Sequence, residues 1–245
     1  MLAGVVKGLV SRFLPQPNND GEEVEVRLNR YGELIMQPSA RKQHSLAEDG
    51  SYFTCNNAQA GLATAAAPTA FSATNPFLLI ANTDNPGSNA RSIYLDYLML
   101  LATAAGTAGA SLQVAVTIDQ GNRYTSGGSE LTANIVNCSM LSAQRTSVAR
   151  VFAGNITAAG AGSNVRTHVG NRYMKGAIPV AGDEYTINFG GIEAMNNISI
   201  STIMKSVFNA PPLIIGPQQC ALVHIWLPSQ SGASSYAPEL SWWER

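Results

Sequence analysis

Three histidines are the first candidates for acid-base or metal chemistry, because they are the chain's only imidazole groups. His44, His168 and His224 stand far apart in the sequence. His224 lies between Val223 and Ile225 in an apolar run, where we expect a neutral, hydrogen-bonded imidazole in a core or an interface rather than a metal ligand. His168 lies in a polar stretch that we expect to be a solvated loop. The histidines therefore predict no metal site.

The three cysteines give no disulfide or zinc pattern. Cys55, Cys138 and Cys220 are widely spaced, and none belongs to a C-x-x-C pair. Disulfide frameworks and zinc sites need paired or closely spaced ligands. We therefore expect three small buried apolar side chains in a reducing compartment.

Catalytic motifs are missing as well. The sequence has no G-x-S-x-G elbow, no phosphate-binding G-x-x-x-x-G-K-[ST] loop and no H-E-x-x-H pair. Asp183 and Glu184 are neighbouring carboxylates, but on a strand they point to opposite faces and cannot act as a catalytic pair. We therefore expect no enzyme activity and no cofactor. A hydrolase with scattered catalytic groups remains the third hypothesis, after the two that are described at the end of this subsection.

The low content of charged residues points to self-association. Charged residues make up 13% of the chain, against about 25% in ordinary globular domains. Residues 1–50 hold 13 of the 31 charged side chains, so residues 51–245 contain an even smaller fraction of charged residues. Surfaces buried between subunits are depleted in Lys, Glu and Asp. The net charge of -1 gives no basic footprint, so we expect no nucleic-acid partner.

Residues 1–17 predict a short amphipathic helix. Their apolar side chains recur at intervals of three and four residues, and Pro15 and Pro17 end the pattern. A helix this short is marginal alone, so its apolar stripe must dock on its own domain or on a partner subunit. The predicted interface residues of this stripe are Val6, Leu9 and Phe13. We expect the segment to be retained, because Lys7 interrupts its apolar run. We also expect no membrane-spanning helix, since the sequence contains no run of 18 apolar residues.

The rest of the chain predicts an all-β fold. We expect a short hairpin and an extended arm over residues 18–75, and then a jelly-roll-like antiparallel β-sandwich over residues 76–245. The arm includes the Ala- and Thr-rich run at 56–76, and ten strand-like segments separated by Gly, Asn, Pro and Ser follow it. Lipocalin-like barrels have short, even hairpins, which are lacking here, and an immunoglobulin-like sandwich is the other contender.

Alternation assigns faces to several of these strands. Tyr185, Ile187 and Phe189 share one face, which we expect to be buried. The run at 222–227 is apolar on both faces, so both should be covered. At the C-terminus, neighbouring Trp242 and Trp243 point to opposite faces of a strand. We expect one indole in the subunit's own core, and we place Trp243 in a contact with another subunit.

Two segments carry a resemblance to a known class of proteins. The runs "KGAIPVAGDEYTINFGG" and "ALVHIWLPSQSGASSYAPELSWWER", with the Ala-, Thr- and Ser-rich loops, resemble virion structural proteins of tailed bacteriophages, especially jelly-roll capsid decoration (cement) and minor capsid proteins. The resemblance implies a non-enzymatic, trimeric subunit on the capsid surface, assembled in the host cytoplasm. Its partners would be its own copies and the major capsid protein or a neighbouring coat component. A major capsid subunit is a variant of this hypothesis.

A sugar- or receptor-binding jelly roll is the main alternative. In such a module an aromatic ring stacks on the sugar, and carboxylates or amides beside it accept and donate hydrogen bonds. The candidates for stacking are Tyr124, Tyr173 and Trp226, and those for polar contacts are Asp119, Asn122 and Asn171. The sequence alone does not bring these six residues together.

Overall fold

The structure is a computed structural model. It describes residues 42–56, 65–109, 111–139, 145–160, 165–174, 178–190 and 207–245. The predicted helix at 1–17 and the hairpin predicted within 18–75 lie outside the described residues. The chain divides into two units, Met1–Lys42 and Gln43–Arg245, and the second contains the sandwich.

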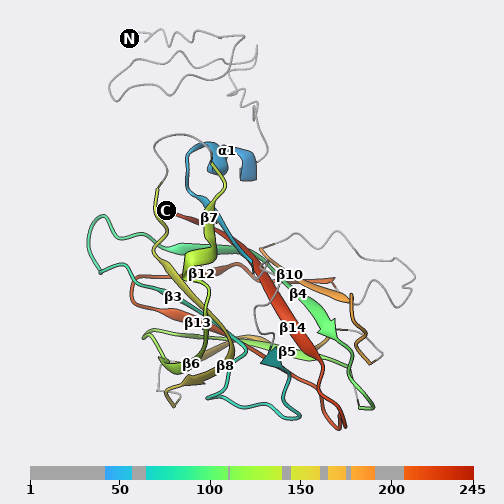
Figure 1. The fold of residues 1–245 in the computed structure, drawn as a ribbon. Helices are drawn as coiled ribbons and strands as arrows, with labels where there is room; N and C mark the ends of the chain where they lie inside the picture. The colour runs from blue at the N-terminus through green and yellow to red at the C-terminus, as the bar shows by residue number, and fades with distance from the viewer. Residues whose placement is uncertain are drawn as a thin grey trace, which may run out of the picture. The chain divides into compact units, whose positions relative to one another are not determined.

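Strands make up most of the described chain (Figure 1). Two short helices, α1 (Lys42–Glu48) and the 3₁₀ helix η1 (Thr132–Asn134), accompany them. The first seven strands are β1 (Tyr52–Asn56), β2 (Ala65–Ala66), β3 (Leu78–Asn82), β4 (Ile93–Ala104), β5 (Gln113–Asp119), β6 (Tyr124–Glu130) and β7 (Ile135–Asn137). The other seven are β8 (Ala149–Ala158), β9 (Arg166–Tyr173), β10 (Glu184–Phe189), β11 (Val207–Ala210), β12 (Leu213–Ile215), β13 (Cys220–Trp226) and β14 (Ser235–Glu244).

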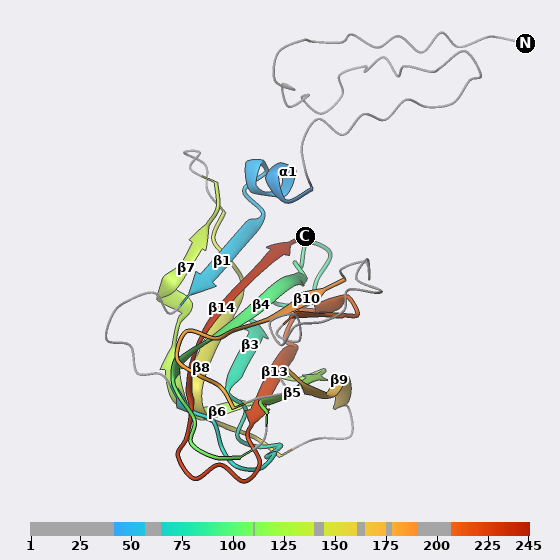
Figure 2. The same cartoon turned by 90° about the vertical axis from the view of Figure 1, so that its right-hand side faces the viewer.

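These strands form two sheets that pack as a sandwich. The eight-stranded sheet has the order β11-β10-β4-β14-β1-β7, with β12 paired to β4 and β2 paired to β14. The six-stranded sheet has the order β6-β8-β3-β13-β5-β9. In Figure 2, β7, β1, β14, β4 and β10 follow one another across the first sheet. All pairings are antiparallel except that of β10 with β11.

The pairing of eight strands is nested, as in a jelly roll. In chain order these strands are β1, β3, β4, β5, β9, β10, β13 and β14. The first pairs with the last (β1 with β14), the second with the seventh (β3 with β13), the third with the sixth (β4 with β10) and the fourth with the fifth (β5 with β9). A long hairpin that is wrapped into two sheets gives this arrangement. The predicted jelly-roll sandwich is therefore confirmed.

An insertion between β5 and β9 widens both sheets along one side. Its strands β6 and β8 extend the six-stranded sheet beyond β3, and its short strand β7 pairs with β1 in the other sheet. Both β3 and β1 would otherwise be edge strands with unpaired backbone groups. The insertion therefore covers two sheet edges at once.

The main core lies between the two sheets. The face predicted for β10 is confirmed, since Tyr185, Ile187 and Phe189 are buried while their neighbours are at least partly exposed. Every residue of β13 is buried, as its two apolar faces predicted. Trp242 is fully buried in the core, where its ring stacks on Phe53 with centroids 6.1 Å apart.

Three features differ from the sequence-based expectations. The sandwich begins before residue 76, because β1 pairs with β14 and contributes Phe53 to the core. His168 lies on β9 rather than in a loop. Cys55 and Cys220 are buried as expected, but Cys138 is exposed, because it follows the short strand β7 at the edge of its sheet. Among the described residues, no helix has the length and apolar character needed to cross a bilayer.

Candidate functional site

A row of large side chains crosses the outer face of the eight-stranded sheet. Register places Tyr52 of β1 opposite Trp243 of β14, Trp243 opposite Tyr94 of β4, and Tyr94 opposite Ile214 of β12. Their strand neighbours point into the core, so these four side chains share the outer face. We call Tyr52, Trp243, Tyr94 and Ile214 the outer row.

The predicted interface residue Trp243 lies in the middle of this row. Its indole stacks on Tyr94, with ring centroids 5.4 Å apart and the planes inclined by 6°. The aromatic members of the row are partly exposed, and Ile214 is 53% exposed. The other predicted interface residues, Val6, Leu9 and Phe13, lie outside the described residues. The structure therefore locates one of the four predicted contact residues, on the outer face of the eight-stranded sheet.

Two tyrosine-carboxylate pairs lie beside the outer row. Tyr52 donates a hydrogen bond of 2.7 Å to Asp96, and Tyr97 donates one of 2.5 Å to Glu239. Asp96 is an extra residue in β4, since Ser241 pairs with Tyr97 and Trp242 pairs with Leu95. This bulge puts Asp96 and Tyr97 next to each other on the outer side. Burial, with a further contribution from the nearby carboxylate, raises the pKa of both tyrosines, so both remain neutral donors.

The charge of this face has one sign. The eight strands of the sheet contain four carboxylates, Asp96, Glu184, Glu239 and Glu244, but no Lys, Arg or His. Glu244 is buried, whereas the other three lie on the outer face, which is therefore acidic. The six-stranded sheet carries both signs, with Arg150 and the arginines of β9 on one hand and Asp119 and Glu130 on the other. Of the two sheets, only the eight-stranded one has no cation in its described strands.

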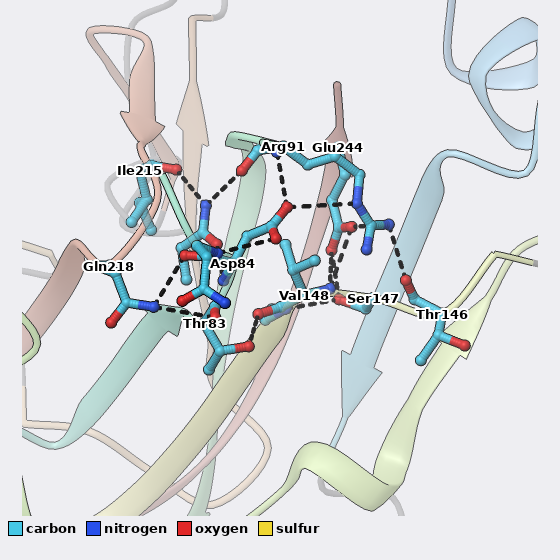
Figure 3. A network of polar contacts seen from close by, with 12 residues as sticks. Thr83, Asp84, Arg91, Thr146, Ser147, Val148, Ile215, Gln218 and Glu244 are labelled. Carbon is cyan, nitrogen blue, oxygen red and sulfur yellow. Dashed lines mark hydrogen bonds and ion pairs between the residues drawn. The ribbon is translucent and has the colours of Figure 1, made fainter. Parts of the chain in front are cut away.

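A polar network at one end of the sandwich fixes the end of β14 and hence the row (Figure 3). Glu244 is only 2% exposed and accepts hydrogen bonds from Arg91, Ser147, the backbone N–H of Val148 and the indole N–H of Trp242. The guanidinium of Arg91 also donates to the carbonyl of Thr146. A buried carboxylate needs such partners. Glu244 therefore ties the last strand to two loops.

The same network orders the loop after β3. The amide of Asn82 donates to the carbonyls of Arg91 and Ile215, and the backbone N–H of Arg91 donates to Asp84. Arg245 and Ser92 exchange backbone hydrogen bonds of 3.1 and 2.8 Å. The C-terminal residues are therefore paired to the end, which sets the positions of Trp242 in the core and Trp243 on the surface.

Two of the residues considered for sugar stacking are engaged within the chain. Trp226 is 7% exposed and lies edge to face with Phe71, at 5.4 Å between centroids. Tyr124 stacks on Phe152 at 3.7 Å. Nothing is described of the side chains of Tyr173 and Asn171.

The polar candidates beside them are used locally. Asp119 forms a buried ion pair of 3.6 Å with Arg123, and the side chain of Asn122 accepts a hydrogen bond from the backbone N–H of Tyr124. These contacts hold the turn that leads into β6. The structure does not assemble the six residues into one described site.

His224 is a buried structural residue. It is 2% exposed, and its Nε2 lies 3.2 Å from the hydroxyl of Thr117. Burial lowers the pKa of His224 to about 4, so the imidazole is neutral near pH 7. This confirms the expectation of a neutral core histidine. The described residues contain no group of three His, Cys, Asp or Glu side chains that could hold a metal ion.

The sequence alone did not reveal the partners of Trp243. Tyr52, Tyr94 and Ile214 come from three segments whose alignment depends on the register of four strands and on the bulge at Asp96. The available signal was the mixed pattern of "RSIYLDYLML", in which Tyr94, Asp96 and Tyr97 interrupt an apolar run. No known protein family, curated protein or solved structure matches this chain.

Proposed function

We propose that this protein is a non-enzymatic structural subunit of a virion, which decorates or cements a capsid by associating with its own copies and with capsid subunits. The nested jelly-roll pairing supports this proposal, because viral coat proteins are among the proteins built on this fold. Lectins and enzymes also use it, so the fold alone does not decide the function. The composition of the outer face carries the rest of the argument.

The single observation that carries the proposal is the outer row on a sheet without Lys or Arg. The centres of protein interfaces are enriched in Tyr, Trp and Met and depleted in Lys, Glu and Asp. The outer face has Tyr52, Tyr94, Tyr97 and Trp243 near its centre, with Met99 next to Glu239. Its aromatic residues, its Met and its lack of Lys are those of a contact surface, whereas its three carboxylates call for a partner that carries positive charge.

Exposed apolar side chains lie toward both margins of this face. Val136 on β7 is 55% exposed, Val207 on β11 is 43% exposed, and Ile214 ends the outer row. Covering the exposed half of one such side chain contributes about 1 kcal/mol. A neighbouring subunit that covers the whole face would gain several kcal/mol from the margins and the aromatic centre together.

Light scattering on the purified full chain tests the self-association. We expect a mass that is a multiple of the 25.9 kDa of one chain, and three times that value for the trimer that the proposal favours. Ile214→Glu places a charge on an exposed position of the outer row, so it should reduce the mass to that of one chain without unfolding it. Thr157→Glu, at an exposed position of β8 in the other sheet, is the matched control and should leave the mass unchanged. A wild-type mass of 25.9 kDa at all concentrations would refute self-association.

Addition to capsids tests the virion role. Purified chain is mixed with capsids that lack it, from the virus that encodes it, and the pelleted capsids are analysed for the bound chain. Saturable binding with a fixed number of copies per capsid is the expected result. A chain that assembles but does not bind capsids, and binds glycans on an array, would instead support the receptor-binding alternative.

A further inference from the structure

We propose that the outer face of one copy binds the N-terminal segment, residues 1–17, of a second copy. This inference rests on the proposed function, since it names the contact through which the copies associate. It joins the two groups of predicted interface residues, which are Val6, Leu9 and Phe13 on one side and Trp243 on the other. The charge of the face, its dimensions and the length of the connecting chain support this contact.

Charge complementarity favours this occupant. Residues 1–17 contain Lys7 and Arg12 but no Asp or Glu. The outer face presents Asp96, Glu184 and Glu239, and no described cation forms an ion pair with any of these three. Within the described part of the chain, Asp96 and Glu239 receive their hydrogen bonds from neutral tyrosines, which leave the charge of the carboxylates in place. A basic segment would therefore supply the missing counter-charges.

The same charges disfavour the symmetric alternative. If two copies met through identical outer faces, Asp96, Glu184 and Glu239 of each would confront the same three carboxylates of the other. Like charges in a contact oppose association. A contact between two different surfaces of the chain avoids this repulsion, and such a contact generates closed rings or extended lattices. Coats are built from assemblies of this kind.

The dimensions of the two surfaces agree. The outer row crosses four strands, and three steps between neighbouring strands span about 14 Å. From Val6 to Phe13 a helix rises about 10 Å, at about 1.5 Å per residue. An apolar stripe of the predicted length therefore fits along the row, and the three carboxylates lie on one side of the row, toward the end of β4.

The connecting chain is long enough to reach a neighbour. Residues 18–41 separate the segment from α1, which begins at Lys42. An extended chain of this length spans at most about 80 Å. That exceeds the size of one jelly-roll domain, so the segment can reach the outer face of an adjacent copy.

Photo-crosslinking on the full chain tests the contact. A photoreactive p-benzoylphenylalanine replaces Ile214 in an unlabelled copy, which is mixed with an isotope-labelled wild-type chain and irradiated. Mass spectrometry should find labelled peptides from residues 1–17 attached at position 214. Attachment only to the unlabelled chain's own segment, or to other parts of the labelled chain, would overturn the inference.

A charge-reversal pair provides the second readout. The double variant Lys7→Glu/Arg12→Glu should weaken self-association at least tenfold, as measured by light scattering over a dilution series. The matched control, Arg27→Glu/Arg30→Glu, reverses the charge of two arginines outside the segment. It should change the strength of self-association less than twofold. If wild type assembles and both double variants assemble equally well, this inference fails while the proposed self-association stands. If wild type itself is monomeric, both fail.

Discussion

The indole of Trp243 stacks on the ring of Tyr94 across two paired strands, whereas the adjacent indole of Trp242 is fully buried on the other side of the same sheet. One strand thus anchors the core with one tryptophan and presents the next to the surface. The side chain of Glu244 accepts a hydrogen bond from Trp242, which ties this arrangement to the C-terminal network.

Alanine substitutions should separate the roles of the two tryptophans. Trp242→Ala leaves a large cavity beside Phe53 and should lower the free energy of unfolding by about 3–5 kcal/mol. Trp243→Ala loses a stacked pair on a partly exposed face and should cost about 1–2 kcal/mol. Urea denaturation of the monomeric protein measures both changes in the free energy of unfolding. Equal losses would mean that the two side chains are equally buried in solution.

The Glu244 network should be a main support of the C-terminal strand. Glu244→Ala leaves Arg91 and the N–H of Val148 without their carboxylate, so the free energy of unfolding should fall by about 3–5 kcal/mol. Hydrogen exchange at the amides of Val148 and Arg245 should accelerate.

An exposed ion pair offers the matched control for Glu244. Glu130 and Arg150 lie 2.9 Å apart, with both side chains 43% exposed. Glu130→Ala should therefore cost less than about 1 kcal/mol. If Glu244→Ala and Glu130→Ala lowered the free energy of unfolding by the same amount, the buried network would stabilise the chain no more than an exposed ion pair does.

His224 should make stability depend on pH. Its pKa in the folded chain is about 4, below the usual 6.5, so between these values only the unfolded chain binds the proton. Stability should therefore fall as the pH drops from about 6.5 to about 4, by up to about 3 kcal/mol from this group. His224→Gln should lack this part of the loss. Denaturation of the wild type and of this variant at pH 7 and at pH 4.5 measures the effect. If the imidazole of His224 were solvated, the two proteins would differ in their free energy of unfolding by the same amount at both pH values.

The three thiols should differ in reactivity. Burial raises the pKa of Cys55 to about 12 and that of Cys220 to about 11, so neither forms thiolate near pH 8. Cys138 is exposed. A colorimetric disulfide reagent should therefore titrate one thiol in the native chain and three in denaturant. Cys138→Ser should abolish the reaction of the native chain with the reagent. Rapid labelling of this variant would show that the core opens and exposes Cys55 or Cys220.

Much of the architecture could be predicted from the sequence. The alternation of Tyr185, Ile187 and Phe189 and the doubly apolar run of β13 reflect burial that each strand encodes locally. The turn residues between the strands indicated a sandwich. The position of β1 was missed, because a five-residue strand next to an Ala-rich run has little pattern of its own and is defined by its pairing with β14.

The outer face was harder to predict for a similar reason. Trp243 was singled out by its type and its place on a strand, but Tyr52, Tyr94 and Ile214 join it only through the registers of separate strands. The bulge at Asp96 reverses the alternation in the middle of β4. No pattern within one segment encodes such an alignment.

Electron cryomicroscopy of virus particles purified from the source of this chain tests the central claim most directly. We expect density for the jelly roll on or between capsid subunits, with Tyr94, Trp243 and Ile214 covered by a neighbouring copy or another coat component. A particle without this chain, or one in which the outer row faces solvent in every copy, would contradict it.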